Sequence, residues 1–237
     1  MKRLIIFLDY VSDYSDRVEK IQNDAANEVI YYYIEDFKKE KLPEKIKPDD
    51  IIYFLTNVKE IKNIVKKLPN NKILNREYYL EDLSKIEIQN TLFNNGLNTP
   101  EIIEYREDLT NNDFPLYVKN KNHDVFVAKI CSKHSFEFFF KKFNPEDFYL
   151  EKEIKSIDII KEHKIYYCNN AIFENDKDPI SLKIKRICNK VAKVTGLDVY
   201  SADLIETKDK VYIVDVNSAP GFWNSKESRL KLIEYCE

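Results

Sequence analysis

The chain has 237 residues, of which 43% are hydrophobic and 13% aromatic. It is therefore long enough to bury a full core, in one large domain or in two or three smaller ones. Its 38 lysine and arginine residues nearly balance its 41 acidic residues. This balance excludes the global basic field that drives non-specific nucleic-acid binding, so nucleic acid is not an expected partner.

The start of the chain carries a short apolar run, residues 4–8, that meets Asp9 too early for a signal peptide or a membrane span. We therefore expect a cytoplasmic enzyme with no membrane partner. The four cysteines are widely scattered and include no CxxC pair, which predicts unbridged thiols rather than a zinc site.

The first 75 residues alternate short apolar β-type runs with polar helical ones. Strands are expected over 4–8, 29–34, 51–55 and 72–74, and helices over 14–25 and 58–68. This rhythm predicts an N-terminal βαβ layer with a parallel sheet, over residues 1–75.

Two further segments of mixed helix and strand are expected after this layer, over residues 76–154 and 155–237. Gly96 and Gly196 each follow an apolar helical pattern and are predicted to end a helix in the left-handed conformation. The fold class is therefore a mixture of α/β and α+β. Helices are expected over 80–95, 132–143 and 181–195, and strands over 114–119, 125–131, 148–154, 164–168, 171–173, 199–206 and 210–216.

The last two expected strands carry the strongest chemical signal. If the hairpin turns around Asp209, then Asp203 and Asp215 lie opposite each other, and Asn217 follows on the same face. Two carboxylates and an amide oxygen suit a hard divalent cation that also binds phosphate. The alternative is that both aspartates are solvated strand residues, but apolar residues on both faces of these strands favour a functional role.

At these residues the sequence resembles the ATP-grasp superfamily, whose last core hairpin carries an acidic residue and then an acid-x-Asn-x-x-Pro-Gly signature. Here that signature covers Asp215 to Gly221. Other parts follow in the family's order from about Asn75 to Ser228. The resemblance is to carboxylate-amine ligases, such as the glutamate ligases that act on ribosomal protein and the D-alanine–D-alanine ligases, and it implies ATP between two α+β lobes.

The resemblance also implies roles for individual residues of the two lobes. It places phosphate contacts at Lys85 and Lys119, with Lys121 as an alternative to the latter. It implies that Glu151 accepts a hydrogen bond from the adenine amino group and that the backbone of Lys152 and Ile154 pairs with the adenine ring. It also implies that Asp158 contacts the ribose. The remaining assignment is a site for Mg²⁺ or Mn²⁺ at Asp203, Asp215 and Asn217.

The implied reaction joins a carboxylate to an amine through an acyl phosphate, on small molecules or peptides, and a homodimer is compatible with this class. The chain departs from the family's pattern in two places. The phosphate loop at 120–124 contains no glycine, and the compact connection at 169–179 lacks the arginines of peptide-type ligases. Two alternatives therefore stay open, a small-molecule kinase and a nucleotide-binding module without turnover, and neither a catalytic residue nor a substrate is assigned.

Overall fold

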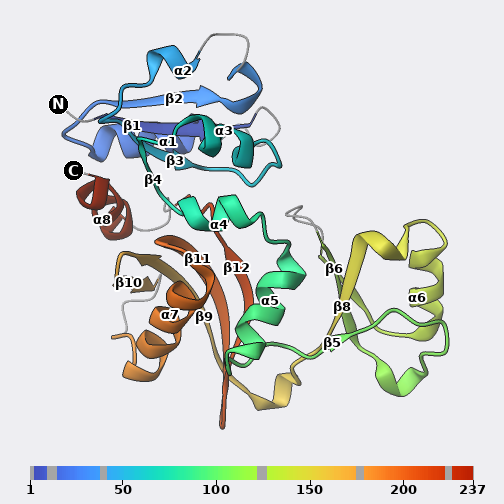
Figure 1. The fold of residues 1–237 in the computed structure, drawn as a ribbon. Helices are drawn as coiled ribbons and strands as arrows, with labels where there is room; N and C mark the ends of the chain where they lie inside the picture. Colours follow the sequence, from blue (N-terminus) through green and yellow to red (C-terminus); the bar gives the residue numbers. More distant parts are fainter. Residues whose placement is uncertain are drawn as a thin grey trace. The chain divides into compact units, whose positions relative to one another are not determined.

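A computed structural model describes residues 3–9, 15–37, 42–121, 127–174, 179–221 and 226–236. The chain divides into two compact units, each built from separate stretches of sequence. The first comprises Met1–Asp82, Lys164–Ala202 and Val216–Glu237, and the second comprises Leu83–His163 and Asp203–Asp215. Over the described residues there are three four-stranded sheets, which Figure 1 shows with their helices.

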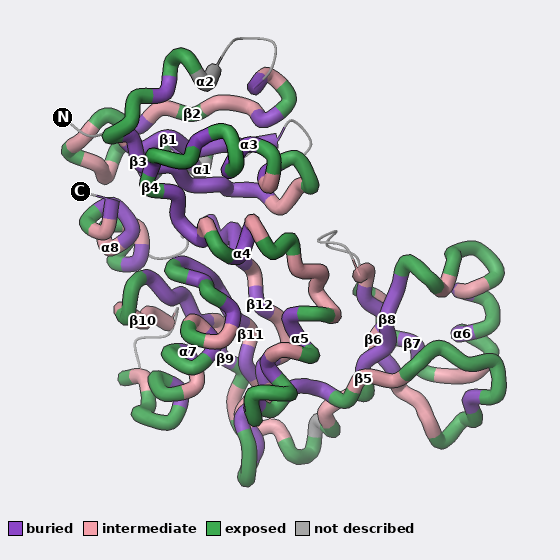
Figure 2. Tube along the Cα trace, viewed as in Figure 1, coloured by how far each residue is buried: buried purple, intermediate pink, exposed green. Residues whose placement is uncertain are grey.

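The first unit contains the parallel sheet predicted for the N-terminal layer. Its strands run in the order β2-β1-β3-β4, and every neighbouring pair is parallel. All residues of β1 and β3 are buried, as Figure 2 shows, because both faces of the sheet are covered. The elements are β1 (Leu4–Leu8), α1 (Ser15–Asp24), β2 (Val29–Tyr33), α2 (Leu42–Lys45), β3 (Ile51–Phe54), α3 (Ile61–Lys67) and β4 (Lys72–Ile73).

Asn75 links the three stretches of the first unit. It is fully buried and adopts the left-handed conformation, with φ of 59°. Its side-chain Nδ2 donates to the carbonyl oxygens of Val199, at 2.6 Å, and Ser218, at 2.8 Å. Its Oδ1 accepts from the Val199 amide at 2.9 Å. One buried amide therefore satisfies backbone groups from two distant parts of the sequence.

Another of the three sheets has the strand order β10-β9-β11-β12. Helix α7 (Leu182–Thr195) begins after the N-cap Ser181 and ends at Gly196, whose φ of 69° confirms the predicted left-handed cap. The remaining elements are β9 (Ile159–Cys168), β10 (Ala171–Glu174), β11 (Val199–Thr207), β12 (Val211–Asn217) and α8 (Lys226–Cys236). The sequence did not predict α8.

The second unit is built on an antiparallel sheet in the order β5-β8-β6-β7. Alternate residues of its central strands, such as Leu116, Val118 and Leu150, pack in one apolar cluster with Phe136 and Phe139 of α6. The residues between them face the other way. The elements are β5 (Ile102–Ile103), β6 (Leu116–Asn120), β7 (Val127–Ile130), α6 (Lys133–Phe140) and β8 (Phe148–Lys152). Strand β5 was not predicted.

The helix expected over 80–95 is present as α5 (Lys85–Asn94), but it begins five residues later than expected, and the separate helix α4 (Arg76–Glu81) before it was not predicted. Asp82 ends α4 with φ of 59°, and Ser84 starts α5 through a capping box with Glu87. The Ser-x-x-Glu spacing was the overlooked signal. Gly96, with φ of 71°, lies in the left-handed conformation after α5, as predicted.

The two compact units cut across the three predicted segments, so the domain boundaries at 75 and 154 stay a prediction. The four cysteines Cys131, Cys168, Cys188 and Cys236 form no disulfide, as predicted. Within the described ranges, no helix combines the length and the apolar character that a membrane span requires.

Candidate functional site

A cavity of about 550 Å³ lies within the second unit. Its apolar lining includes Tyr117, Val127, Ile159 and Ile205. Most of the residues singled out from the sequence also line it. These are Lys85, Lys119, Glu151, Lys152, Ile154, Asp203 and Asp215.

Lys119 and Glu151 reach the cavity from neighbouring antiparallel strands. Tyr117 of β6 pairs with Glu151 of β8, and Lys119 pairs with Tyr149. All four side chains therefore lie on the face of the sheet opposite the apolar cluster around Phe136 and Phe139. The Lys119 Nζ atom is 2.5 Å from Glu151 Oε2 and 2.9 Å from the Val214 carbonyl oxygen. Both partners of this ion pair are more than nine-tenths buried.

Glu151 keeps one carboxylate oxygen without a hydrogen-bond partner among the described residues. Its Oε1 atom is buried and unsatisfied, whereas Oε2 is paired with Lys119. Burial raises the pKa of Glu151 above its ordinary value, although the neighbouring Lys119 ammonium opposes that shift. A buried acceptor in this state is costly unless a ligand supplies a donor.

Lys85 is fixed by the local structure of α5. It is the first residue of the helix, directly after the N-cap Ser84, and its own amide donates to the Lys121 carbonyl oxygen at 3.2 Å. Its Nζ atom lies 2.9 Å from Asp215 Oδ1 of β12. One helical turn later, Gln89 Nε2 donates to the Val214 carbonyl oxygen at 3.1 Å. Helix α5 is therefore joined to two consecutive residues of β12, Val214 and Asp215.

The hairpin that carries the two aspartates turns within the predicted loop, and the expected pairing of Asp203 with Asp215 across it stays a prediction. The Thr207 amide donates to the Lys210 carbonyl oxygen at 2.8 Å, which places Lys208 and Asp209 in the turn. Asp203 and Asp215 both line the cavity. Asn217 belongs to the first unit, where its Oδ1 accepts from the Ala219 amide at 3.0 Å. Its predicted role as a metal ligand stays a prediction.

Two carboxylates, Asp203 and Asp215, line the cavity, and carboxylate oxygens are ligands that hard divalent cations prefer, so this donor type fits Mg²⁺ or Mn²⁺. Asp215 Oδ1 lies 2.9 Å from the Lys85 Nζ atom. In the described part of the chain, no group of three or more histidine, cysteine, aspartate and glutamate side chains is arranged to hold a metal.

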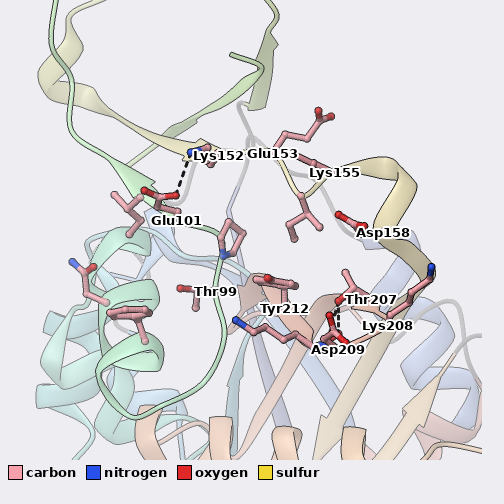
Figure 3. Close-up of a pocket in the computed structure, with 16 residues that line it drawn as sticks. Thr99, Glu101, Lys152, Glu153, Lys155, Asp158, Thr207, Lys208, Asp209 and Tyr212 are labelled. Carbon is pink, nitrogen blue, oxygen red and sulfur yellow. Dashed lines mark hydrogen bonds and ion pairs between the residues drawn. The ribbon is translucent and has the colours of Figure 1, made fainter. Parts of the chain in front are cut away.

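Asp158 lines a different cavity of the same unit, with a volume of about 720 Å³. Figure 3 shows Asp158 there with Lys155, with Thr207 at the end of β11 and with Lys208 of the hairpin turn. The two cavities share a wall, formed by Pro100 and residues 152–154. The ribose contact assigned to Asp158 stays a prediction, since this side chain does not line the cavity that collects the other residues.

Two predicted features fall wholly or partly outside the described residues. The glycine-free loop at 120–124 is described only through Lys121, and Lys121 does not line the 550 Å³ cavity. The compact connection at 169–179 is described except for residues 175–178.

The sequence matches no family model and no curated protein. Solved structures nevertheless match the whole chain. A RimK-domain ATP-grasp protein from Sphaerobacter thermophilus gives a TM-score of 0.70 at 12% identity, covering 99% of both chains. A D-alanine–D-alanine ligase from Bacillus anthracis gives 0.71 at 16% identity, covering 100% of this chain and 96% of its own. The ATP-grasp ligase PsnB, solved with a precursor variant, Mg and ADP, gives 0.68 at 11% identity, covering 99% and 97%.

Proposed function

The chain has the ATP-grasp fold, and we propose that it is an ATP-dependent ligase that joins a carboxylate to an amine. One observation carries the proposal. A single cavity collects two lysines of the kind that bind phosphate, Lys85 and Lys119, and three carboxylates, Glu151, Asp203 and Asp215. These groups come from five elements, and the resemblance assigns each of them to the nucleotide or to its metal ion.

In this proposal, Glu151 and the residues after it bind the adenine ring. The unsatisfied Oε1 atom of Glu151 accepts a hydrogen bond from the adenine amino group, which supplies the missing donor. The backbone of Lys152 and Ile154 pairs with the ring edge. Tyr117, Val127 and Ile205 give the cavity apolar surface for the flat base.

The charges of the cavity favour a nucleotide that arrives with a metal ion. Three lysines and five acidic residues line it, so free ATP meets an excess of negative charge. We propose that Asp203, Asp215 and Asn217 hold Mg²⁺ or Mn²⁺. When bound, the ion draws charge from the phosphate oxygens as a Lewis acid.

The proposed reaction proceeds in two transfers. A substrate carboxylate oxygen attacks the γ-phosphorus, and the bond from that phosphorus to the bridging oxygen of ADP breaks. The amine nitrogen then attacks the acyl carbon, releases inorganic phosphate and loses a proton. Lys85 and Lys119 neutralise phosphate charge during the first transfer, and such chemistry depends on positioning and charge rather than on a nucleophilic side chain. The substrates are small-molecule or peptide carboxylates and amines.

The direct test is a thermal-shift measurement with MgATP on the wild type and on Asp215→Ala/Asn217→Ala. We expect MgATP to raise the melting temperature of the wild type but not of the variant, because a ligand stabilises the state that binds it. Lys62→Met is a matched control, since Lys62 forms a partly exposed ion pair with Asp82 outside the cavity. A wild type that MgATP does not stabilise contradicts the proposal.

ADP release over a panel of amino acids and short peptides then tests the ligase activity. Release that requires both a carboxylate and an amine supports it. A small-molecule kinase is the alternative, favoured by the absence of arginine from the connection at 169–179. A phosphorylated product that accumulates without any amine would select the kinase. MgATP binding without ADP release on any acceptor would indicate a binding module.

A further inference from the structure

The ion pair between Lys85 and Asp215 joins a proposed phosphate ligand to a proposed metal ligand. Their charged atoms are 2.9 Å apart, and their side chains are 20% and 31% exposed. Both line the 550 Å³ cavity, so the pair is only partly screened by water. The Asp215 oxygen that a metal ion would bind is therefore the one that the Lys85 ammonium contacts.

We propose that Lys85 makes metal binding at Asp215 dependent on the nucleotide. Without nucleotide, the Lys85 ammonium occupies the carboxylate and competes with a divalent ion. Nucleotide phosphates give Lys85 a second set of oxygens, and its transfer to them releases Asp215 for the metal. This inference rests on the proposed function, and it adds an order to the binding events.

The described contacts allow this exchange without movement of the helix. The capping box of Ser84 and Glu87 fixes the backbone at Lys85, whereas the lysine side chain itself is long and flexible. Gln89 continues to hold the Val214 carbonyl oxygen next to Asp215 when Lys85 leaves. Rotation of one side chain is therefore sufficient, and β12 keeps its attachment to α5.

The exchange also follows from the ligand requirements of the metal. A Mg²⁺ or Mn²⁺ ion prefers about six oxygen ligands, and phosphate oxygens and water supply those that the protein does not. The nucleotide thus strengthens metal binding in two ways, by adding oxygens and by removing a competing cation. By linkage, the metal strengthens nucleotide binding by the same factor.

The test is a titration with Mn²⁺ in which the unbound ion is followed by electron paramagnetic resonance, with and without a non-hydrolysable ATP analogue. For Mn²⁺ alone, we expect Lys85→Met to bind roughly ten-fold more tightly than the wild type, since the competing charge is gone. The factor by which the analogue tightens Mn²⁺ binding should shrink in this variant. Lys85→Arg keeps a cation and should behave as the wild type, as should Lys62→Met.

Equal Mn²⁺ affinities of the wild type and Lys85→Met in the absence of nucleotide overturn the inference. The inference is also overturned if the double variant Lys85→Met/Asp215→Asn still binds Mn²⁺ more tightly than the wild type, because the metal then binds elsewhere. Lys85→Gln repeats the measurement if Lys85→Met fails to fold, as judged by circular dichroism. A wild type that binds no Mn²⁺–nucleotide complex overturns the proposed function itself, whereas one that binds it without a gain in Lys85→Met overturns only the inference.

Discussion

Each unit of the molecule buries a carboxylate against a cation, and the two pairs differ in how completely they are satisfied. In the first unit, Asp50 accepts from Arg3 Nε at 2.9 Å, from Arg3 Nη2 at 2.6 Å and from the Lys47 amide at 2.7 Å. In the second unit, Glu151 accepts from Lys119 on one oxygen, and its other oxygen has no partner among the described residues.

The pKa values of these two carboxyls shift in opposite directions. Burial alone would raise the pKa of Asp50, but hydrogen bonds from Arg3 and the Lys47 amide outweigh it and lower that pKa. Burial raises the pKa of Glu151, and Lys119 offsets this only in part. The complete pair stabilises the fold, whereas the incomplete pair leaves an acceptor ready for a ligand.

The largest expected effect is the loss of stability in Asp50→Ala. Removal of one partner leaves the Arg3 guanidinium without its carboxylate, and breaking a buried pair in this way costs about 3–5 kcal/mol. Denaturant unfolding measures the free energy of unfolding. MgATP should still raise the melting temperature of the variant, since Asp50 does not line the cavity. A folded variant that no longer responds to MgATP would contradict a purely structural role for Asp50.

Glu151→Ala should weaken ATP binding by roughly 10- to 100-fold, because a hydrogen bond to a charged group contributes about 1.5–3 kcal/mol. Inosine triphosphate lacks the adenine amino group and is the matched ligand. The wild type should prefer ATP over it, and the variant should lose this preference. The ratio of the two dissociation constants is the readout, because loss of the Lys119 pair also lowers stability. An unchanged ratio contradicts the adenine role of Glu151.

The two carboxyls should also give opposite pH dependences of stability. The folded pKa of Asp50 lies below its ordinary value of 3.8, so its contribution is complete above that pH and is lost as the pH falls through the folded pKa. The folded pKa of Glu151 lies above its ordinary value of 4.5, so its contribution is complete below that pH and is lost as the pH rises through the folded pKa.

Unfolding measured between about pH 3 and pH 8 can separate these contributions. Asp50→Asn should reduce the pH dependence of the free energy of unfolding below the ordinary aspartate pKa of 3.8. Glu151→Gln should reduce that dependence above the ordinary glutamate pKa of 4.5. If Glu151→Gln instead reduces the pH dependence of stability only below the ordinary glutamate pKa of 4.5, the two carboxyls do not shift in opposite directions.

The smallest expected effect belongs to Asp158→Ala. Its side chain lines the 720 Å³ cavity and not the one that collects the lysines and carboxylates, so the affinity for MgATP should change by less than about two-fold. Isothermal titration calorimetry measures it, with Asp215→Ala as the sensitive reference. A ten-fold loss would instead support the ribose contact and place the nucleotide across both cavities.

Much of the fold was predictable because its signals are local. The alternation of apolar runs gave the parallel sheet with its strands in place, and Gly96 and Gly196 gave two helix ends. The break between α4 and α5 was missed, since an apolar period continues across Asp82 and Ser84 while the capping chemistry interrupts it. Strand β5 has only two residues and depends on its pairing with β8.

Asp203 and Asp215 could be singled out from residue type and strand spacing, whereas Lys85 and Lys119 followed from the family resemblance. The structure places all four along one cavity. The ion pairs Lys85–Asp215 and Lys119–Glu151 were not predictable, because they depend on side-chain approach between elements far apart in the sequence. Gln89 was missed for the same reason, since a helix glutamine gives no sign that it will hold the Val214 carbonyl oxygen.

The buried amide of Asn75 has a consequence for how the chain acquires its structure during synthesis. Its partners Val199 and Ser218 leave the ribosome long after Asn75 itself. Until then, the side-chain amide of Asn75 lacks its native partners. The parallel sheet can form early, but the first unit cannot close around Asn75 until the last of its three stretches has been made.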